Sequence, residues 1–363
     1  MSAVLRVLHL VGSTTDDLHL ELSRLYAASC LDAVRDPARY EPLIALVSPD
    51  GTWRFPSALT DAAVDAAAPL TLPAALDHLV GERPDVAVPQ MFCDAGLTHH
   101  RALLALLGIP SVGNGPTVMA TSLDKAATRA IVAAAGVDVP AGEVVRPGAS
   151  PTLSLPVVVK PVATDNSVGV SLVRAAGELD AALARAWAHG DALVESYVEL
   201  GREVRCGTIV RDGRLVALPV EEYAVDPVHK PVRDARDKLA RDAGGRLRLV
   251  AKDATHAWIV DPDDPVTAAA GEVAVACHRA LGCGHHGLFD LRIDPAGRPW
   301  FLEAGPYCSF GANSVVPTMA AAAGIPVTEL FADAVAFALH HDRAPTRSAA
   351  RSAAPPPPAP TRT

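Results

Sequence analysis

The sequence has no cysteine pattern that would indicate a metal knot or a redox couple. Its six cysteines are scattered along 363 residues, and no two of them form a C-x-x-C pair. We therefore expect buried or idle thiols in a reducing compartment. Cys308 is of interest because it lies in a loop that follows an acidic hairpin at residues 288–303.

Long apolar runs are also absent. Stretches such as 157–159 and 332–339 are far shorter than the roughly 20 apolar residues that a bilayer-spanning helix needs. The chain begins in a strand-like run, without a basic segment and a cleavage site. We expect a soluble, cytoplasmic protein that has no membrane partner.

Positive charge is scarce. The 32 Lys and Arg residues are outnumbered by 41 Asp and Glu residues, which gives a net charge of −9. A nucleic-acid partner requires clustered Lys and Arg, and the sequence shows no such cluster. The Walker A pattern G-x-x-x-x-G-K-[ST] is missing as well, which excludes that type of phosphate loop.

Hydrophobic residues are plentiful. The first third of the chain alternates between predicted strands and helices. Hydrophobic residues make up 50% of the sequence, enough for a core divided over two or three units. The run from Val4 to Val11 predicts a strand, with a turn at Gly12, and the ranges 43–47 and 86–88 predict further strands. Alternation of this kind favours an α/β unit over residues 1–115, with a parallel sheet covered on both faces.

The pattern changes after residue 115. Residues 116–202 predict a small α+β unit, which begins with a helix that has Ser122 as its N-cap. Residues 203–343 form a third unit, with a helix around 272–281 followed by the acidic hairpin. The tail at 344–363 is rich in Pro, Ala and Arg, and we expect it to be disordered.

The acidic hairpin carries two carboxylates. If residues 295–298 form its turn, Asp290 lies directly opposite Glu303. Like charges that face each other across two strands repel. A magnesium ion between them removes that objection, because Mg²⁺ prefers carboxylate oxygens and substrate phosphates. The spacing alone leaves open that both acids simply face water.

Two lysines are candidates for binding phosphate. Lys160 ends a buried-type strand at 157–160, and a loop of small residues follows at 165–169. A lysine beside exposed backbone N–H groups can hold phosphate oxygens while the loop folds over them. Lys125, on the preceding helix, is the second candidate. Each lysine taken alone is equally compatible with a solvated surface charge.

Two further acids are associated with an apolar strand at 192–195: Glu195 ends it, and Glu203 follows it. A carboxylate can accept hydrogen bonds from an adenine amino group or from ribose hydroxyls. Surface acids of a connecting segment are the alternative.

Taken together, these elements resemble the ATP-grasp superfamily, specifically the D-alanine–D-alanine ligases. The matching segments occur in the family's order: "SLDK", "VVVKPVATDNSVGV", "ALVESYVELGRE", "LFDLRID" and "FLEAGPYCSFGANSVVP". The resemblance covers residues 85–335, and more loosely the chain from residue 1. It implies an ATP-grasp fold of three domains, ATP and Mg²⁺ as cofactors, and small-molecule carboxylate and amine substrates. By analogy it also implies a homodimer.

The resemblance assigns roles to particular residues. The family's nucleotide contacts fall on Lys125, Lys160, Asn166, Ser167, Val168, Glu195, Val198 and Glu203. The two lysines match the phosphate ligands, the loop at 162–169 matches a flexible lid, and the two acids match the adenine and ribose contacts. Asp290 and Glu303 match the magnesium carboxylates. The implied reaction passes through an acylphosphate, which an amine captures.

The chain departs from the family at two positions beside the metal acids. Leu288 replaces an arginine that neutralises the tetrahedral intermediate. We expect the missing charge from one of three cations, Arg292, Lys238 or Lys252, with Lys160 as a further catalytic cation. Gly305 replaces an asparagine ligand, so a second metal ion is either absent or held by water and a side chain such as Asn313.

Further departures lie where the family binds its substrates. Residues 91–96 replace the family's "HGxxGEDG" segment, and the acid that orients the first substrate has no clear counterpart near His19 and Glu21. We infer a carboxylate donor other than D-alanine, and a role outside cell-wall dipeptide synthesis. Ser314 matches the site for the second substrate's carboxylate, so an amino-acid acceptor stays open. The candidate substrate contacts are His19, Glu21, Gly305, Ser309, Asn313 and Ser314.

Three functions stay open. The first is an amino-acid or dipeptide ligase of specialised metabolism, and the second is ATP-dependent cyclisation of one amino-acid derivative. The third, prompted by Leu288 and Gly305, is a nucleotide-binding protein without catalysis. The histidine pairs at 99–100 and 285–286 suggest a metal site, but neighbouring residues on a strand point to opposite faces. A structural or surface role is the prediction for both pairs.

Overall fold

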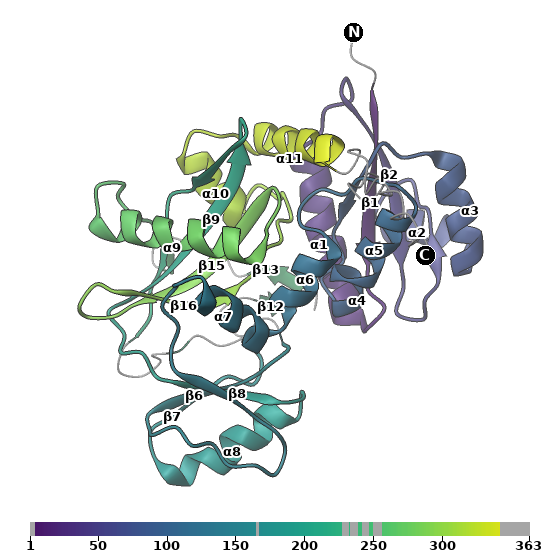
Figure 1. Cartoon of the computed structure of the whole chain (residues 1–363). Helices are drawn as coiled ribbons and strands as arrows, with labels where there is room; N and C mark the ends of the chain where they lie inside the picture. Colours follow the sequence, from purple (N-terminus) through teal and green to yellow (C-terminus); the bar gives the residue numbers. More distant parts are fainter. Residues whose placement is uncertain are drawn as a thin grey trace, which may run out of the picture.

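The computed structural model describes residues 4–164, 167–226, 232, 239–241, 247–249 and 256–341. The predictions for Asn166, Lys238, Lys252 and the tail at 344–363 lie outside the described residues. In Figure 1 the strands nearest the N-terminus lie at the right, the strands that carry the C-terminal helices lie at the left, and a further group of strands lies at the bottom of the view.

The N-terminal sheet has the strand order β3-β2-β1-β4. Its strands are β1 (Leu5–Gly12), β2 (Tyr40–Val47), β3 (Trp53–Arg54) and β4 (Val86–Pro89). Strand β1 is parallel to β2 and to β4, whereas the short β3 is antiparallel to β2. The surrounding helices are α1 (Asp17–Ala33), α2 (Asp61–Ala66), α3 (Leu72–Glu82), α4 (Asp94–Leu97) and α5 (His99–Leu106).

Separate apolar clusters lie on the two faces of this sheet. One joins Val11 and Ile44 to Ala27 of α1, and the other joins Leu8 and Leu10 to residues of α3 and α5. The prediction of a parallel sheet covered on both faces is therefore confirmed. The pair at 99–100 lies on helix α5, so its placement on a strand was wrong.

The turn from β1 into α1 depends on Gly12. Its φ is +120°, and a Cβ atom there would lie 2.0 Å from the Val47 carbonyl oxygen. Only glycine fits such an approach without displacing the neighbouring strand. Asp16 then caps α1 by accepting a hydrogen bond from the backbone N–H of His19 at 2.8 Å.

Two consecutive helices lead from the first sheet to the second, α6 (Pro116–Leu123) and α7 (Lys125–Ala134). Ser122 does not cap a helix, contrary to the prediction, because it lies in the last turn of α6 and donates to the Val118 carbonyl. Asp124 caps α7 instead, accepting from the backbone N–H of Ala127 at 2.8 Å. Ser122 and Asp124 are both residue types that cap helices, and α7 begins at Lys125, two residues later than expected.

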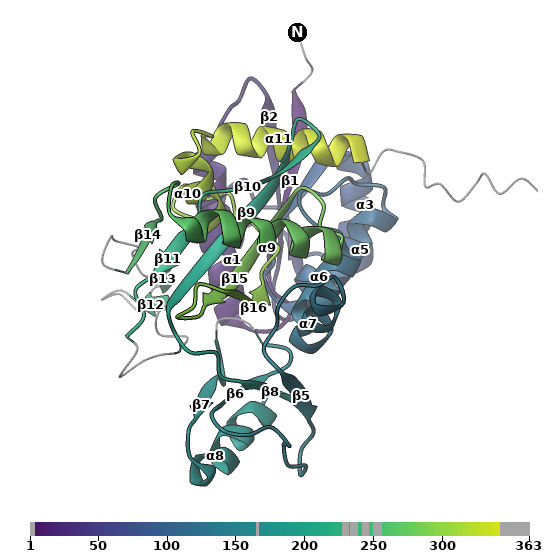
Figure 2. The ribbon, with the colours of Figure 1, turned by 60° about the vertical axis from the view of Figure 1, so that its left-hand side comes forward.

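The second sheet is antiparallel, with the order β5-β8-β6-β7. Its strands are β5 (Gly142–Val145), β6 (Val157–Pro161), β7 (Ser171–Val173) and β8 (Ala192–Ser196), and α8 (Ala176–Trp187) covers one face. Figures 1 and 2 both show this unit at the bottom of the molecule, below the third sheet.

The third sheet has six strands, in the order β14-β11-β9-β15-β16 with β10 paired to β9. They are β9 (Arg202–Arg211), β10 (Arg214–Ala217), β11 (Glu221–Tyr223), β14 (Ala257–Ile259), β15 (His286–Ile293) and β16 (Pro299–Ala304). A separate two-stranded sheet joins β12 (Leu239–Arg241) to β13 (Leu247–Leu249). The helices are α9 (Pro265–Leu281), α10 (Val315–Ala322) and α11 (Val327–His341), and α9 begins earlier than the predicted 272.

Alternation along the strands separates an apolar face from a charged face. Phe289, Leu291 and Ile293 of β15 join Val204 of β9 in the buried cluster that includes α9. Residues 288, 290 and 292 of β15, and 203 and 205 of β9, therefore point to the other face. Four of those five positions carry charge. The fifth, Leu288, is buried in the cluster that joins the first and third sheets.

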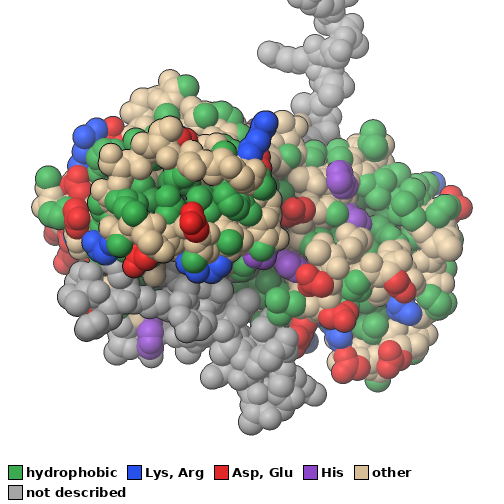
Figure 3. Space-filling model, turned by 90° about the horizontal axis from the view of Figure 1, so that it is seen from below, with side chains coloured by type: hydrophobic (Ala, Val, Ile, Leu, Met, Phe, Trp, Pro, Cys, Tyr) green, Lys and Arg blue, Asp and Glu red, His purple; other side chains and the backbone are tan. Residues whose placement is uncertain are grey.

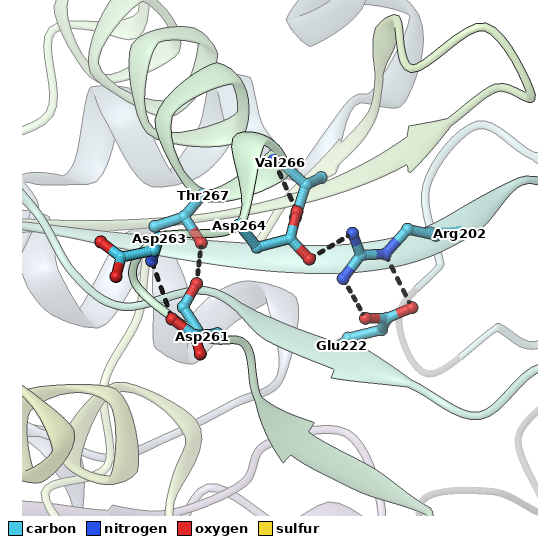
Figure 4. Close-up of polar contacts among 7 residues, drawn as sticks. All are labelled: Arg202, Glu222, Asp261, Asp263, Asp264, Val266 and Thr267. Atoms are coloured by element: carbon cyan, nitrogen blue, oxygen red, sulfur yellow. Dashed lines mark hydrogen bonds and ion pairs between the residues drawn. The ribbon is translucent and has the colours of Figure 1, made fainter.

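The first residue of β9, Arg202, belongs to a charged cluster that fixes the start of this strand. Figure 4 shows Arg202 between two carboxylates, with hydrogen bonds to Glu222 and to Asp264. Asp264 also caps α9 by accepting from the backbone N–H of Val266 at 2.9 Å. Arg202 thus ties β9 to β11 and to the start of α9.

Seen from below in Figure 3, acidic and basic side chains are interspersed over the residues drawn in colour. Among the helices of the described ranges, none is alone long and apolar enough to cross a membrane. Helices α10 and α11 pass that test only as a pair, and they meet at a bend of 110°.

Candidate nucleotide and metal site

A cleft with about 740 Å³ of space, part of it open to solvent, lies between the second and third sheets. Its lining residues are Pro140, Val158, Lys160, Ser167, Val170, Glu195, Ser196, Val198, Glu203, Val232, Asp290, Arg292, Leu302 and Glu303. The structure therefore brings together eight of the residues that the sequence singled out, from segments up to 143 residues apart (Lys160 to Glu303).

Asp290 and Glu303 are cross-strand neighbours on β15 and β16, as the hairpin spacing predicts. The pairing register shifts directly after Asp290, so the two acids end the regular part of this ladder. No group of three or more His, Cys, Asp and Glu side chains in the described ranges could hold a metal ion. Two facing carboxylates still fit a Mg²⁺ ion, which commonly takes one or two protein carboxylates beside substrate phosphates.

The carboxylate of Asp290 is held by an arginine that the sequence analysis missed. Arg205, opposite Asp290 on β9, donates from Nε to Oδ1 and from Nη2 to Oδ2, the latter at 2.8 Å. Burial lowers the pKa of Arg205, but the charge of Asp290, its hydrogen bonds and the neighbouring Tyr223 and Glu221 together outweigh this effect and raise the pKa well above its ordinary value. The repulsion between the two acids is therefore offset partly by a protein cation.

Lys125 compensates the second acid. Its Nζ lies 3.6 Å from Glu303 Oε1 and also donates to the carbonyl of Thr164 in the loop after β6. The backbone N–H of Lys125 donates to the Val162 carbonyl at 3.0 Å. Lys125 is buried and belongs to the first turn of α7, so it connects the predicted lid loop to the acid pair.

At the other end of the cavity, Lys160 and Glu195 form a buried pair. The Nζ of Lys160 lies 2.6 Å from Glu195 Oε2, and it also contacts the carbonyl of Leu302 at 3.4 Å. The Nε of Arg129 lies 3.3 Å from the other oxygen of Glu195. Two cations thus surround one buried carboxylate, which keeps Lys160 in place at the end of β6.

Glu203 has a cation of its own, Arg292. The Nη2 of Arg292 donates to Glu203 Oε2 at 2.6 Å, and Nη1 donates to the Val198 carbonyl at 3.3 Å. The guanidinium also lies over the Tyr197 ring, 5.5 Å from its centroid. Arg292 therefore lines the cavity as predicted, and its described contacts position the segment predicted to bind adenine and ribose.

The loop between β6 and β7 carries Ser167 and Val168. Thr164 Oγ1 donates to the Val168 carbonyl at 3.2 Å, which closes the loop on itself. Gly169 has a φ of +76°, and a Cβ atom there would lie 2.8 Å from the Pro161 ring. A glycine is therefore needed where the loop passes over the end of β6.

The predicted substrate contacts lie in two other places. Gly305, Ser309, Asn313 and Ser314 belong to the loop between β16 and α10. Ser309 Oγ and Ser314 Oγ are 2.5 Å apart, and Gln90 and Asn114 donate to the carbonyls of Ser309 and Pro306. The N-terminal unit thus holds this loop.

His19 and Glu21 lie on α1. Nδ1 of His19 is 2.8 Å from the carboxylate of Asp16. Burial raises the pKa of Asp16, but hydrogen bonds from His19 outweigh it and hold that pKa below its ordinary value. The sequence analysis did not identify Asp16, which lies beside the predicted contact His19. The "TTDD" sequence at the start of α1 could have indicated it as a helix cap.

The buried histidines and Cys308 are structural groups. His285 and His286 are both buried, with their Nδ1 atoms 3.4 Å apart, so the prediction that they point to opposite faces was wrong. Burial lowers the pKa of His285 to about 4, which keeps the ring neutral. Burial raises the pKa of Cys308 to about 12. The six cysteines are all free, as expected.

Comparisons with known proteins show which family the chain is similar to. Residues 143–336 match the family described as the C-terminus of D-Ala–D-Ala ligase. The D-alanine–D-alanine ligase of Mycolicibacterium smegmatis is 31% identical over 354 residues, covering 86% of this chain and 92% of that protein.

Two solved structures share the fold. The VanG D-Ala:D-Ser ligase from Enterococcus faecalis has a TM-score of 0.75 at 20% identity, covering 93% of this chain and 100% of that one. The D-alanine–D-alanine ligase from Bacillus anthracis, complexed with ATP, has a TM-score of 0.67 at 19% identity, covering 93% and 98%.

Proposed function

Because the chain belongs to the D-alanine–D-alanine ligase family of ATP-grasp carboxylate–amine ligases, we propose that it joins two small amino acids in an ATP-dependent reaction. ADP and phosphate are the other products. The observation that carries the proposal is the single cavity lined by Lys160, Asp290 and Glu303, with Lys125 behind Glu303. This is the set of charges that positions a triphosphate and neutralises it.

In the proposed reaction, an oxygen of the donor carboxylate attacks the γ-phosphorus of ATP, and ADP leaves. The acceptor amine then attacks the acyl carbon, phosphate leaves, and the amine gives up a proton. Bound Mg²⁺, held by Asp290 and Glu303, would withdraw charge from the phosphates. Lys160 and Lys125 orient the phosphate oxygens, and the loop at 162–169 shields the acylphosphate from water.

D-Alanine is the first donor to test, and the names of the relatives favour it. The departures at residues 91–96 and near His19 and Glu21 are the specific observation that favours another donor, and with it a role in specialised metabolism. Leu288 is buried among apolar side chains that include Val88 and Phe310, so this position supplies packing in place of charge. We expect the enzyme to act in the cytoplasm, where ATP and free amino acids are available.

The test is a screen for ADP release with ATP, Mg²⁺ and single or paired amino acids, including D-alanine with D-alanine and D-alanine with D-serine. Product mass separates the outcomes: ligation adds the mass of a second substrate and loses water, whereas cyclisation only loses water. Release that requires D-alanine supports the proposed donor. Nucleotide binding without release on any amino acid would favour a binding protein without catalysis, and would overturn the proposal.

A further inference from the structure

Resting on the proposed function, we propose that Arg129 positions the carboxylate of Glu195 to accept a hydrogen bond from the 6-amino group of the ATP base. Arg129 is a positioning residue in this account, because it acts on the nucleotide through Glu195. Glu195 lines the cavity, and so does Pro140, whose carbonyl accepts a hydrogen bond from Nη2 of Arg129. Arg129 therefore contacts two residues of the cavity wall.

The first support is the burial of the ion pair. Arg129 Nε lies 3.3 Å from Glu195 Oε1, and the two side chains are 16% and 5% exposed. A buried carboxylate is costly unless cations or hydrogen-bond donors compensate its charge. The Nζ of Lys160 lies 2.6 Å from Oε2 of the same acid. Each oxygen of Glu195 therefore has a cation beside it.

The second support is the different duty of the two cations in the proposed reaction. Lys160 also orients phosphate oxygens, so its ammonium is shared between Glu195 and the triphosphate. Arg129 is anchored at the carbonyl of Pro140 instead. A guanidinium is planar and rigid, so an arginine anchored at one nitrogen keeps its charge in a fixed place. The orientation of Glu195 therefore depends on Arg129 while Lys160 binds phosphate.

The third support is a glycine that leaves room for this pair. Gly142 of β5 is the register partner of Glu195 on β8. A Cβ atom at Gly142 would lie 3.0 Å from Arg129 Cζ and 3.1 Å from Glu195 Cγ. Contacts that short force a neighbour to move, so a side chain at position 142 displaces the guanidinium or the acid. The edge of the second sheet is thus shaped to admit an arginine from another element.

The fourth support is the helix that carries Arg129. Lys125 and Arg129 lie one turn apart on α7, so their side chains share one face of the helix. Lys125 contacts Glu303 of the third sheet, whereas Arg129 contacts Glu195 of the second. Val132 of the same helix belongs to the buried cluster of the third sheet. Helix α7, which Figure 2 shows above β5 and β8, therefore fixes Glu195 relative to the proposed metal acids.

The chemistry of the base gives the preference that results. The 6-amino group of adenine is a hydrogen-bond donor, and an ionised carboxylate only accepts. One hydrogen bond to a charged group contributes about 10-fold or more in affinity. A carboxylate held in place therefore favours a purine that carries the 6-amino group, and a carboxylate that turns away loses this preference even where the nucleotide still binds.

The test measures the binding of two nucleotides to the full-length chain by isothermal titration with Mg²⁺ and without amino acids. They are ATP and purine riboside triphosphate, which differs from ATP only in lacking the 6-amino group. The wild-type protein should bind ATP about 10-fold or more tightly. Equal affinities would overturn the inference and leave the proposed function standing. If neither nucleotide binds, the proposed function fails and the inference fails with it, so the two failures are distinguishable.

Variants of Arg129 add a readout that a merely structural arginine would not move, which is the ratio of the two affinities. Arg129→Met removes the cation that orients Glu195, so the ratio should fall by about 10-fold, toward equal binding. Arg129→Lys keeps a positive charge at this position and should retain most of the ratio. A wild-type ratio in Arg129→Met would overturn the inference, even if both affinities are lower.

The matched control is Arg298→Met. Arg298 forms an exposed ion pair with Asp138, two residues before Pro140, and its Nε donates to Asp138 Oδ2 at 2.6 Å. This pair joins the hairpin turn to the segment that leads into β5, so its loss should leave the ratio unchanged. A fall as large as that in Arg129→Met would assign the effect to the segment as a whole, against the inference.

Gly142→Ala keeps every charged group and tests the positioning alone. Its added methyl group crowds the guanidinium of Arg129, so the ratio should fall, by a smaller factor than in Arg129→Met. Circular dichroism and thermal melting confirm the folding of each variant. Should Arg129→Met fail to fold, Gly142→Ala decides the question, and an unchanged ratio there would overturn the inference.

Discussion

The two ends of the cavity use the same ion-pair chemistry in different ways. At the end proposed to hold the nucleoside, Glu195 and Glu203 are buried, with side chains 5% and 11% exposed, and basic groups hold both acids. At the end proposed to hold the metal, Asp290 and Glu303 also have basic partners, but their side chains are 24% and 29% exposed. The acids of the first end, here called the fixed end, are therefore less accessible to solvent than those of the second, the open end.

The largest expected effect comes from removing a charge at the open end. Glu303→Gln takes away one of two proposed metal carboxylates while keeping its size, so we expect amino-acid-dependent ADP release to fall by about 10³-fold or more. The coupled enzymatic measurement of ADP at saturating substrates checks this. Glu329→Gln on α11, where Glu329 pairs with Arg211, is the control and should keep full activity. Equal activity in both variants would remove Glu303 from the site.

Lys160→Met should combine a catalytic loss with a loss of stability. Removing Lys160 leaves the buried Glu195 with Arg129 as its remaining cation among the described residues, and breaking one side of a buried pair costs about 3 kcal/mol. We expect ADP release to fall by about 10²-fold and the melting temperature to drop. Differential scanning calorimetry beside the activity measurement separates the two effects. A variant that loses activity but melts like the wild type would show that this end is less tightly fixed than the structure indicates.

The effect of pH on stability should arise away from the cavity. Burial lowers the pKa values of His9, His278 and His285 to about 4, so the unfolded chain binds more protons than the folded one between pH 4 and 6.5. Stability should therefore fall as the pH drops through this window, by about 1.4 kcal/mol per histidine for each unit of pKa difference. Urea unfolding at pH 7 and pH 5 measures the slope. His278→Gln should flatten it, and an unchanged slope would contradict the neutral state of that ring.

The smallest effect is expected at the fixed end. Arg292→Ala removes the hydrogen bonds to Glu203 and to the Val198 carbonyl, so the segment that contacts the nucleoside loses its support. We expect KM for ATP to rise by about 10-fold with kcat nearly unchanged, because the loss affects ground state and transition state equally. Steady-state kinetics with varied ATP check the split. A large fall in kcat with an unchanged KM would instead place Arg292 among the catalytic cations, as the sequence first suggested.

The two ends of the cavity also show which features of the site could be predicted from the sequence. The facing of Asp290 and Glu303 agrees with the prediction, although the turn alone does not set it: residues 291–293 pair in a register shifted by one residue, and the irregularity after Asp290 restores the predicted pair. The family and its ATP-grasp fold were predicted from the order of several short motifs and are confirmed. Arg205 could not be identified in the same way, because its pairing with Asp290 joins strands 85 residues apart in sequence.

The loop with the predicted substrate contacts was less predictable, because its contacts also join segments far apart in the sequence. The loop that holds Ser309 and Ser314 is fixed by Gln90 and Asn114 of the N-terminal unit, and such contacts leave no local pattern. The helix start at Lys125 was missed because Ser122 and Asp124 are both good caps, and packing decides between them. The division into domains at residues 115 and 202 stays a prediction.

The most direct test of the central claim is the anomalous scattering of Mn²⁺ in crystals grown with a non-hydrolysable ATP analogue. The account predicts a strong peak within about 2.5 Å of carboxylate oxygens of both Asp290 and Glu303, with the analogue's phosphates near Lys160. A nucleotide bound elsewhere, or a metal that contacts neither acid, would contradict it.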